Sequence, residues 1–212
     1  QSTNRYRLMD LTSGKTYYSR MTTNSLFRGA ITKNGKYFAH AEMNRYTKES
    51  KVILYDIKSK KTNIIENLSR KGSFRISDDG KFVMTYTQDD GGFRVVSVGS
   101  EEVIYEYKHQ SSDNELIYTF ELSSDGKKVA AFIKKKDSAD IVVHDYTKAK
   151  RKLIKNINLD MAYWGTYFTE ESRYLSVTGM GRRFGESFKV CELVDLVTGE
   201  SVDLRAGMEG SP

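Results

Sequence analysis

A nine-residue segment recurs four times along this chain at nearly constant spacing, and such a repeat limits the fold more than any single motif. The copies are 31–39 (ITKNGKYFA), 76–84 (ISDDGKFVM), 122–130 (LSSDGKKVA) and 168–176 (FTEESRYLS). The fifth position returns every 45 or 46 residues and is held by Gly35, Gly80, Gly126 and Ser172. A period between about 20 and 50 residues is typical of repeat architectures. The fold is therefore expected to consist of similar units.

Each copy has the pattern of a β-hairpin. An apolar residue and a Ser or Thr precede a polar residue and the glycine position, and a Lys or Arg and a β-rich run follow. Asn-Gly and Asp-Gly pairs supply the positive φ angles that a tight turn needs. We therefore predict structural turns at Gly35, Gly80 and Gly126, each of which joins two strands.

A second element follows each hairpin at a similar interval. It occurs at 6–15, 52–61, 93–102, 141–150 and 190–200, and in each copy a polar turn separates two β-rich stretches. Asp56, Asp145 and Asp195 hold matching places in it. We interpret these carboxylates as structural turn residues because catalytic acids are not needed once per repeat, whereas turn hydrogen bonds are. Four strands per unit are typical of a propeller blade.

The predicted fold is all-β: a β-propeller of four-stranded antiparallel blades, with about four full blades and a half blade, in a single domain over residues 1–212. The half blade covers 5–26, the blades cover 27–68, 73–110, 115–156 and 161–205, and 206–212 is a tail. The first unit supplies only its last two strands, so the ring is expected to be incomplete in this chain. Residues ahead of Gln1, or another subunit, are expected to close it, because open sheet edges invite pairing.

The repeats also resemble those of a known group of proteins. Residues 77–81 and 123–127 read Ser-x-Asp-Gly-Lys, and Tyr-Asp or His-Asp closes a later strand at Asp56 and Asp145. These phrases resemble the WD-repeat-like repeats of TolB-type proteins and of the propeller domain in prolyl oligopeptidase relatives, and the resemblance spans nearly the whole chain. The proline common in that turn is replaced in every copy, and the Trp-Asp and Gly-His dipeptides of true WD repeats are absent.

Motifs for catalysis or cofactor binding are weak. No Gly-x-Ser-x-Gly elbow occurs, so the hydrolase part of a prolyl oligopeptidase relative is not among these residues. Residues 13–16 end like a phosphate-binding loop, but Met9 stands where its first glycine belongs. The three histidines lack the spacing of metal ligands. We predict no enzyme activity, no catalytic residue, no cofactor and no metal. Cys191, the single cysteine, favours a reducing, cytoplasmic location.

Two loops are candidate partner-binding sites. The glycine-rich stretch 179–185 carries Arg182, Arg183 and Phe184, which form either a plain hairpin tip or a recognition tip for a carboxylate or phosphate. Residues 127–155 hold ten basic and three acidic side chains in a protein of net charge +6. Within this stretch Lys134, Lys135 and Lys136 occupy one expected hairpin loop and 148–152 the next, at opposite ends of the blade. A solvated charged rim is the alternative interpretation of these lysines.

Three functions remain open on the sequence. The leading one is a protein-interaction scaffold that presents propeller loops to partner proteins, which the basic surplus suggests are acidic. The first alternative is the propeller domain of a larger, peptidase-like enzyme, where it would control substrate access. The second is a basic module that binds RNA or an anionic surface, although few aromatic residues lie among the lysines. The sequence contains no run of about 18 apolar residues, so it predicts no transmembrane segment.

Overall fold

The computed structural model describes residues 3–47, 49–68, 74–87, 92–108, 116–134, 139–157, 160–169, 171–183 and 186–204. The backbone contacts group the chain into two compact units, Gln1–Lys108 and His109–Pro212. The predicted single domain over 1–212, with its blade limits, stays a prediction. The regular elements of the described residues are β-strands, and none of these residues forms a helix long and apolar enough to cross a bilayer.

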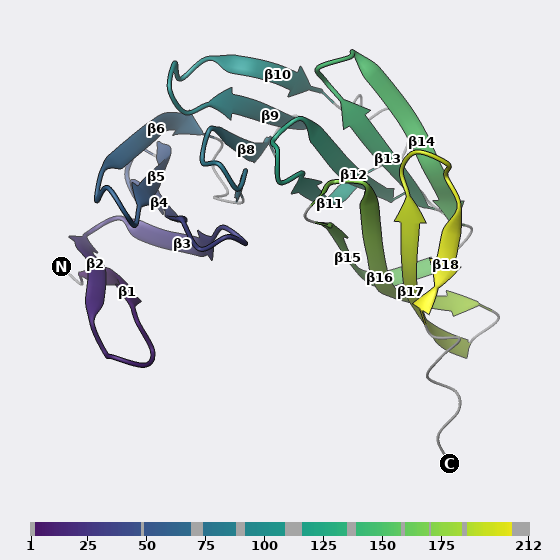
Figure 1. Ribbon diagram of the computed structural model, residues 1–212, viewed down its shortest axis with the longest axis horizontal. Helices are drawn as coiled ribbons and strands as arrows, with labels where there is room; N and C mark the ends of the chain where they lie inside the picture. The colour runs from purple at the N-terminus through teal and green to yellow at the C-terminus, as the bar shows by residue number, and fades with distance from the viewer. Residues whose placement is uncertain are drawn as a thin grey trace. The chain divides into compact units, whose positions relative to one another are not determined.

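The first unit contains three antiparallel sheets (Figure 1). The half blade pairs β1 (Asn4–Met9) with β2 (Thr16–Thr22). Blade 1 consists of β3 (Ser25–Ile31), β4 (Tyr37–Met43), β5 (Ser50–Asp56) and β6 (Thr62–Leu68). Blade 2 consists of β7 (Phe74–Ile76), β8 (Phe82–Thr87), β9 (Gly92–Ser97) and β10 (Val103–Tyr107). In each sheet the strands are neighbours in sequence order.

The second unit contains two further sheets of four strands. Blade 3 consists of β11 (Leu116–Leu122), β12 (Lys128–Lys134), β13 (Ala139–Asp145) and β14 (Lys150–Ile157). Blade 4 consists of β15 (Asp160–Phe168), β16 (Tyr174–Arg183), β17 (Glu186–Asp195) and β18 (Ser201–Asp203). Four four-stranded antiparallel sheets and a two-stranded one confirm the predicted fold class. Among the described residues the half blade has two of a blade's four strands, so the ring is incomplete.

The repeated Ser or Thr explains why each first hairpin forms. In blade 3 the Ser123 hydroxyl donates to the Asp125 carboxylate at 2.6 Å and accepts the Lys128 N–H at 2.9 Å, so one side chain closes the turn from inside. Thr32 and Ser77 make the same pair of bonds. The φ angles at the glycine position are 68°, 70° and 69° at Gly35, Gly80 and Gly126, and 55° at Ser172. Among the described residues of these turns, only the one at the glycine position has a positive φ.

The repeated aspartates lie at the turn between the third and fourth strands of their blades. The Asp56 carboxylate accepts the N–H groups of Lys58 at 2.9 Å and Ser59 at 3.0 Å. These backbone hydrogen bonds stabilise the charged form and lower the pKa of Asp56. Asp195 accepts N–H groups two and three residues later in the same way, and Asp145 accepts the Thr147 hydroxyl at 2.7 Å. Each carboxylate therefore serves its own turn.

The core of each unit lies between consecutive blades. Alternate residues of a strand point to opposite faces of its sheet, so each blade can offer an apolar face to each neighbour. Between blades 1 and 2 the buried side chains are Ala39, Ala41, Val52, Leu54, Ile65, Phe74, Val83 and Val96. Between blades 3 and 4 they are Ala130, Phe132, Ile141, Val143, Phe168, Leu175, Val177 and Val194. This face-to-face burial stabilises the stack of blades.

Candidate partner-binding site

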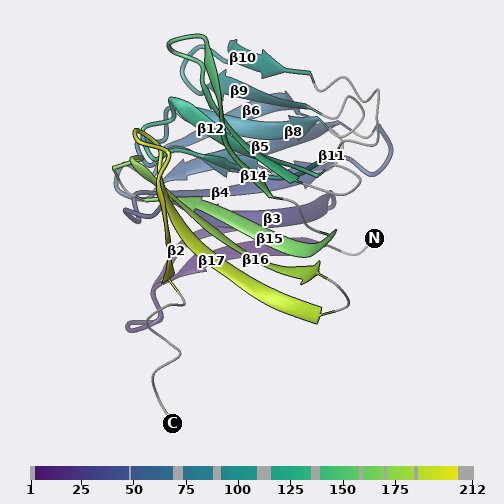
Figure 2. The ribbon, with the colours of Figure 1, turned by 90° about the vertical axis from the view of Figure 1, so that its right-hand side faces the viewer.

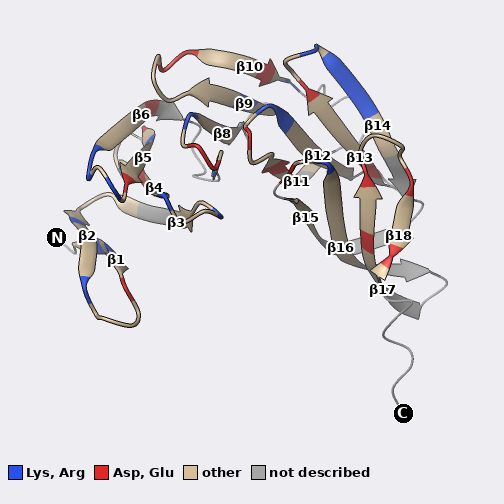
Figure 3. Ribbon diagram, in the orientation of Figure 1, with Lys and Arg blue, Asp and Glu red and all other residues tan. Residues whose placement is uncertain are grey.

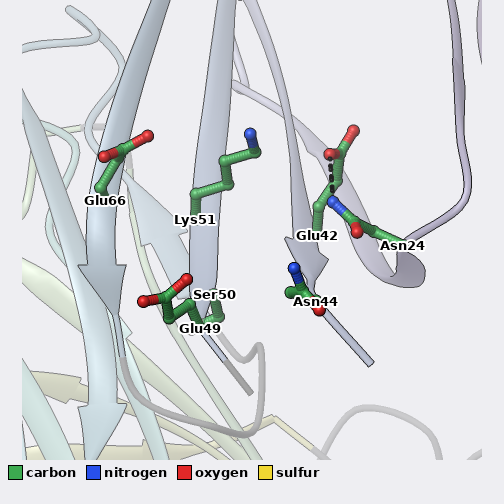
Figure 4. A pocket seen from close by; sticks show the side chains of 7 residues that line it. All are labelled: Asn24, Glu42, Asn44, Glu49, Ser50, Lys51 and Glu66. Atoms are coloured by element: carbon green, nitrogen blue, oxygen red, sulfur yellow. Dashed lines mark hydrogen bonds between the residues drawn. The ribbon is translucent and has the colours of Figure 1, made fainter. Parts of the chain in front are cut away.

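A polar pocket opens at the end of blade 1 where β4 is joined to β5 (Figure 4). It has a volume of about 180 Å³ and is lined by Asn24, Glu42, Asn44, Glu49, Ser50, Lys51 and Glu66. The lining holds three carboxylates and one ammonium group, and because Glu42 is paired with Arg20, Glu49 and Glu66 against Lys51 leave a net charge of −1 that suits a cationic or amide group. The turn at Gly35 lies at the opposite end of the same sheet, because β4 runs from that turn toward the pocket.

Glu42 forms one wall of the pocket and is already neutralised. Its side chain is fully buried and accepts the Arg20 Nε–H at 2.8 Å. Asn24 Nδ2 donates to the other oxygen at 3.3 Å, a bond drawn in Figure 4. This hydrogen bond from Arg20 to the Glu42 carboxylate stabilises the charged guanidinium and raises the pKa of Arg20. Glu42 therefore connects the half blade to blade 1, and its negative charge is neutralised by Arg20.

His40 lies beside this ion pair on the same face of β4. Its Nε2 lies 2.9 Å from the Tyr18 hydroxyl, and the Tyr6 ring centroid lies 4.0 Å from its own. Burial lowers the pKa of His40 to about 4, so the ring is neutral at neutral pH. Nδ1 lies 3.8 Å from Glu42 Oε1 and has no hydrogen bond to a described residue. His40 does not line the pocket, so its role is in the half-blade contact.

The predicted arginine tip lies at the end of an extended hairpin. Arg182 pairs with Ser187 and Arg183 with Glu186, at the end of β16 and the start of β17. Figure 2 shows these two long strands side by side. Each of these strands has 10 residues, whereas β4, β5, β12 and β13 have 7. Three extra residues lengthen a strand by about 10 Å. Phe184 lies outside the described residues. The two central strands of blade 4 are thus longer at this end than those of blades 1 and 3.

The two lysine clusters lie at opposite ends of blade 3. Lys134 ends β12 and pairs with Ala139, whereas Lys135 and Lys136 lie outside the described residues. The other cluster follows the turn at Asp145 and runs along the outer strand β14 (Figure 3). Lysines on an edge strand hinder pairing with another sheet.

Two lysines of the second cluster have partners within the unit. Lys148 Nζ lies 3.7 Å from the Asp145 carboxylate. Lys152 Nζ donates to the carbonyls of Leu196 and Val197, both at 3.3 Å, and so connects blade 3 to blade 4. This part of the basic sector therefore has a structural role within the second unit.

The pocket was not found from the sequence, although β4 carries a signal. His40 and Glu42 stand two positions apart in a strand whose other residues are largely apolar, and that spacing places both on one face. The described residues contain no cluster of His, Cys, Asp and Glu that could hold a metal ion.

Comparison with known proteins finds likeness in structure alone. No protein-family model and no curated protein matches this sequence. The propeller domain of the trilobed protease from Pyrococcus furiosus is 15% identical, with a TM-score of 0.66, over 96% of this chain and 64% of that one. Acylaminoacyl peptidase from Pyrococcus horikoshii is 13% identical, with a TM-score of 0.67, over 97% and 36%. TolB from Acinetobacter baumannii is 14% identical, with a TM-score of 0.57, over 92% and 47%.

These likenesses confirm the expected relation to the propellers of TolB-type proteins and of peptidases at the level of the fold. This chain spans 36 to 64% of the length of the three structures. Identities of 13 to 15% carry the arrangement of strands and not the chemistry of a site.

Proposed function

We propose that this chain is a non-catalytic interaction module whose blades hold a protein partner at their loop ends. The observation that carries the proposal is the long β16–β17 hairpin, which brings Arg182 and Arg183 to the end of blade 4. Loops on a rigid β-scaffold can change in sequence without disrupting the core, so they commonly hold the residues that bind a partner. Arginine grips a carboxylate with two parallel hydrogen bonds, which suits an acidic partner.

The charge of the chain supports the same partner chemistry. Residues 127–155 contribute ten basic and three acidic side chains, whereas the whole chain has a net charge of +6. A concentrated surplus steers an acidic protein toward one part of the molecule and raises its association rate. The acidic pocket of blade 1 then serves as a separate point of contact for a basic or amide side chain of a partner.

The test is quantitative capture of partners by matched variants. Arg182→Ala with Arg183→Ala should reduce recovery of specific partners from the native source about tenfold or more, because each lost charged contact costs about 1 to 3 kcal/mol. Lys58→Ala with Lys61→Ala removes the same charge at an exposed turn of blade 1 and should leave recovery unchanged. Both variants should melt like the wild type. Equal recovery with all three proteins would refute the role of the tip.

A second candidate is the propeller domain of a larger peptidase-like enzyme. It is favoured by the likeness to acylaminoacyl peptidase, of which this chain covers 36%. Treating the full-length protein with a fluorophosphonate probe for activated serines distinguishes the interaction module from the enzyme domain. Labelling outside these 212 residues supports the enzyme. Absence of labelling, together with loss of partner capture in the arginine variant, supports the interaction module.

A further inference from the structure

Two outer strands of the chain carry opposite charges (Figure 3). Residues 101–108, which contain β10, hold three acidic side chains and one basic one. β14 holds four basic side chains and no acidic one. Among the described strands each lies at the edge of its sheet, since β10 pairs with β9 alone and β14 with β13 alone. Each edge therefore offers unpaired backbone groups beside side chains of one predominant charge.

Both edges also expose an apolar side chain near the middle of the strand. Ile104 is 40% exposed on β10, and Leu153 is 54% exposed on β14. Ile154, the next residue of β14, packs instead against the core between blades 3 and 4. Charged side chains protect an edge strand from pairing, whereas exposed apolar ones favour it. The exposed isoleucine and leucine are therefore suited to a contact in which they cover each other.

An antiparallel register matches the two edges. When Ile104 lies opposite Leu153, the neighbouring positions of the two strands face each other in reverse order. This alignment places Glu106 opposite Arg151, and Glu102 opposite position 155, which is a lysine in the sequence. Apolar pairs and pairs of opposite charge across an antiparallel ladder both stabilise it. One alignment therefore provides an apolar pair and two charge pairs.

The existing ladders permit this register. β10 departs from its ladder with β9 at Ile104, and β14 departs from its ladder with β13 at Ile154. An extra residue in a ladder bends its strand. In the register with Ile104 opposite Leu153, the two irregular positions are neighbours, so both strands bend at the same level.

Each edge repels a copy of itself. Two β10 strands in an antiparallel pair centred on Ile104 place Glu102 of one strand opposite Glu106 of the other. Two β14 strands centred on Leu153 place Arg151 opposite position 155, so two basic residues meet. Like charges directly opposite destabilise an antiparallel pair. The charges therefore disfavour a contact between like edges and favour a contact of β10 with β14.

We propose that β10 of one molecule pairs with β14 of a second copy of this chain, in an antiparallel contact that extends both sheets. The occupant is a second copy because each edge has the complementary charges, the apolar partner and the register that the other needs. The two surfaces differ, so the contact is heterologous, and every assembly that does not close into a ring keeps one free β10 and one free β14. The contact uses neither the arginine tip nor the pocket of blade 1, so it is independent of the proposed function.

Part of the charge on each edge is already engaged within the molecule. Lys152 Nζ donates to two carbonyls of blade 4. The Glu106 carboxylate lies 4.0 Å from Arg94 and 3.8 Å from Lys108, distances longer than those of a charged hydrogen bond. Glu106 thus keeps the capacity for a shorter bond to an added strand. Exposed charge pairs are weak and screened by salt, so association should be strongest at low ionic strength and high concentration.

Sedimentation equilibrium of the full-length protein tests the contact. The weight-average mass should rise with concentration from the micromolar to the millimolar range and pass that of a dimer, since each added copy presents a new edge. Raising the salt from about 0.05 M to about 0.5 M should weaken the association about tenfold, because the charge pairs are screened. Amide exchange at residues 103–107 and 150–154 should slow in the associated state.

Two variants that each add one lysine define which edges meet. Ile104→Lys on β10 and Leu153→Lys on β14 should each weaken the association about tenfold or more. A mixture of the two should form dimers and grow no further, because the intact β14 of the first meets the intact β10 of the second, while the altered edges repel each other. Ile64→Lys is the control, since Ile64 is 37% exposed on β6, the outer strand of blade 1. It should associate like the wild type, and unchanged melting shows that all three fold.

An exchange of charges tests the register. Glu106→Lys and Arg151→Glu should each weaken the association about tenfold, because each places like charges opposite one another. An equimolar mixture of the two should associate like the wild type, since opposite charges then meet at both kinds of contact.

Four results would overturn the proposal. A monomer mass at millimolar protein and low salt would exclude a second copy and leave the edges to a different polypeptide. Loss of association in only one of the two lysine variants would indicate pairing of like edges. An equal loss in Ile64→Lys would show a general effect of added charge. Failure of the charge-exchange mixture to associate would exclude the pairing of Glu106 with Arg151.

Discussion

The half blade meets blade 1 through polar and aromatic groups, whereas blade 3 meets blade 4 mainly through apolar side chains. The positions concerned are the same in the repeat: Phe38, His40 and Glu42 on β4 correspond to Leu175, Val177 and Gly179 on β16. His40 and Glu42 are fully buried against Tyr18 and Arg20, whereas Leu175 and Val177 are buried in a largely apolar core. The repeat thus sets which positions face the neighbouring blade, and the chemistry at those positions is free to differ.

This difference has consequences for stability. Apolar burial is non-directional and does not depend on ionisation, so the contact between blades 3 and 4 should respond little to pH. A buried polar contact is stable only while its groups stay hydrogen-bonded in the right protonation state. The half blade should therefore be the part of the first unit that is most sensitive to acid.

Acidification should give the largest effect. Burial lowers the pKa of His40 to about 4, from 6.5 in the unfolded chain, so the unfolded state binds the proton first as the pH falls. Stability is retained above about pH 6.5 and lost progressively down to pH 4, by about 3 kcal/mol for this one group. The measurement is urea unfolding at several pH values, with amide exchange of residues 4–22 to locate the loss.

The matched control replaces His40 by valine, the residue that blade 4 has at the corresponding position, Val177. His40→Val should remove about half of the pH dependence between 4 and 6.5, because burial also lowers the pKa of His144 to about 4. This variant is expected to be less stable at pH 7, since the Tyr18 hydroxyl loses its partner. An unchanged slope of stability against pH would show that His40 is not the acid-sensitive group.

The hairpin turns of the two units differ in a similar way. Tyr37 and Lys128 hold the same position of the repeat, and each reaches the turn of the following blade. The Tyr37 ring lies over Gly80, where an added Cβ would stand 2.7 Å from a ring carbon. Lys128 Nζ instead donates to the Ser172 carbonyl at 3.2 Å. The first contact excludes a side chain at the turn and the second tolerates one.

Alanine substitutions sharpen this contrast. Gly80→Ala should cost about 2 to 3 kcal/mol, because it combines the strain of a positive φ with displacement of the Tyr37 ring. Gly35→Ala has a similar φ but no atom within 4 Å of the new Cβ, and should cost about 1 kcal/mol. Denaturant unfolding measures both. Tyr37→Ser should restore part of the loss in Gly80→Ala, and similar costs for the two alanines would exclude the ring contact.

The sequence predicts what each repeat does by itself. Glycine spacing, alternation and the turn aspartates are local signals, so blade number and strand order follow from them, and Ser172 is identified as a fourth turn residue although it is not glycine. Contacts between repeats could not be predicted in this way, because they join residues that are far apart in the sequence. Lys152 belongs to a basic cluster in the sequence, yet it bonds to carbonyls 44 and 45 residues away. The pocket around Glu42 likewise needs residues from the half blade and from three strands of blade 1.

Ser172 provides the smallest effect and the most direct test of the turn. Its φ of 55° costs a non-glycine residue about 1 kcal/mol, and its buried hydroxyl has no hydrogen-bond partner among the described residues. Ser172→Gly removes both penalties and keeps the carbonyl that accepts Lys128, against the extra chain entropy of glycine. It should raise the free energy of unfolding by about 1 kcal/mol in urea.

The reverse substitution, Gly126→Ser, should lower the stability by a similar amount, because Gly126 holds the same position with a φ of 69°. Opposite signs for the two substitutions would show that the conformation of the turn sets the preference for glycine. If Ser172→Gly instead destabilised the protein, the serine hydroxyl would have to contribute more than the strain it imposes, and blade 4 would use a different turn from the other three.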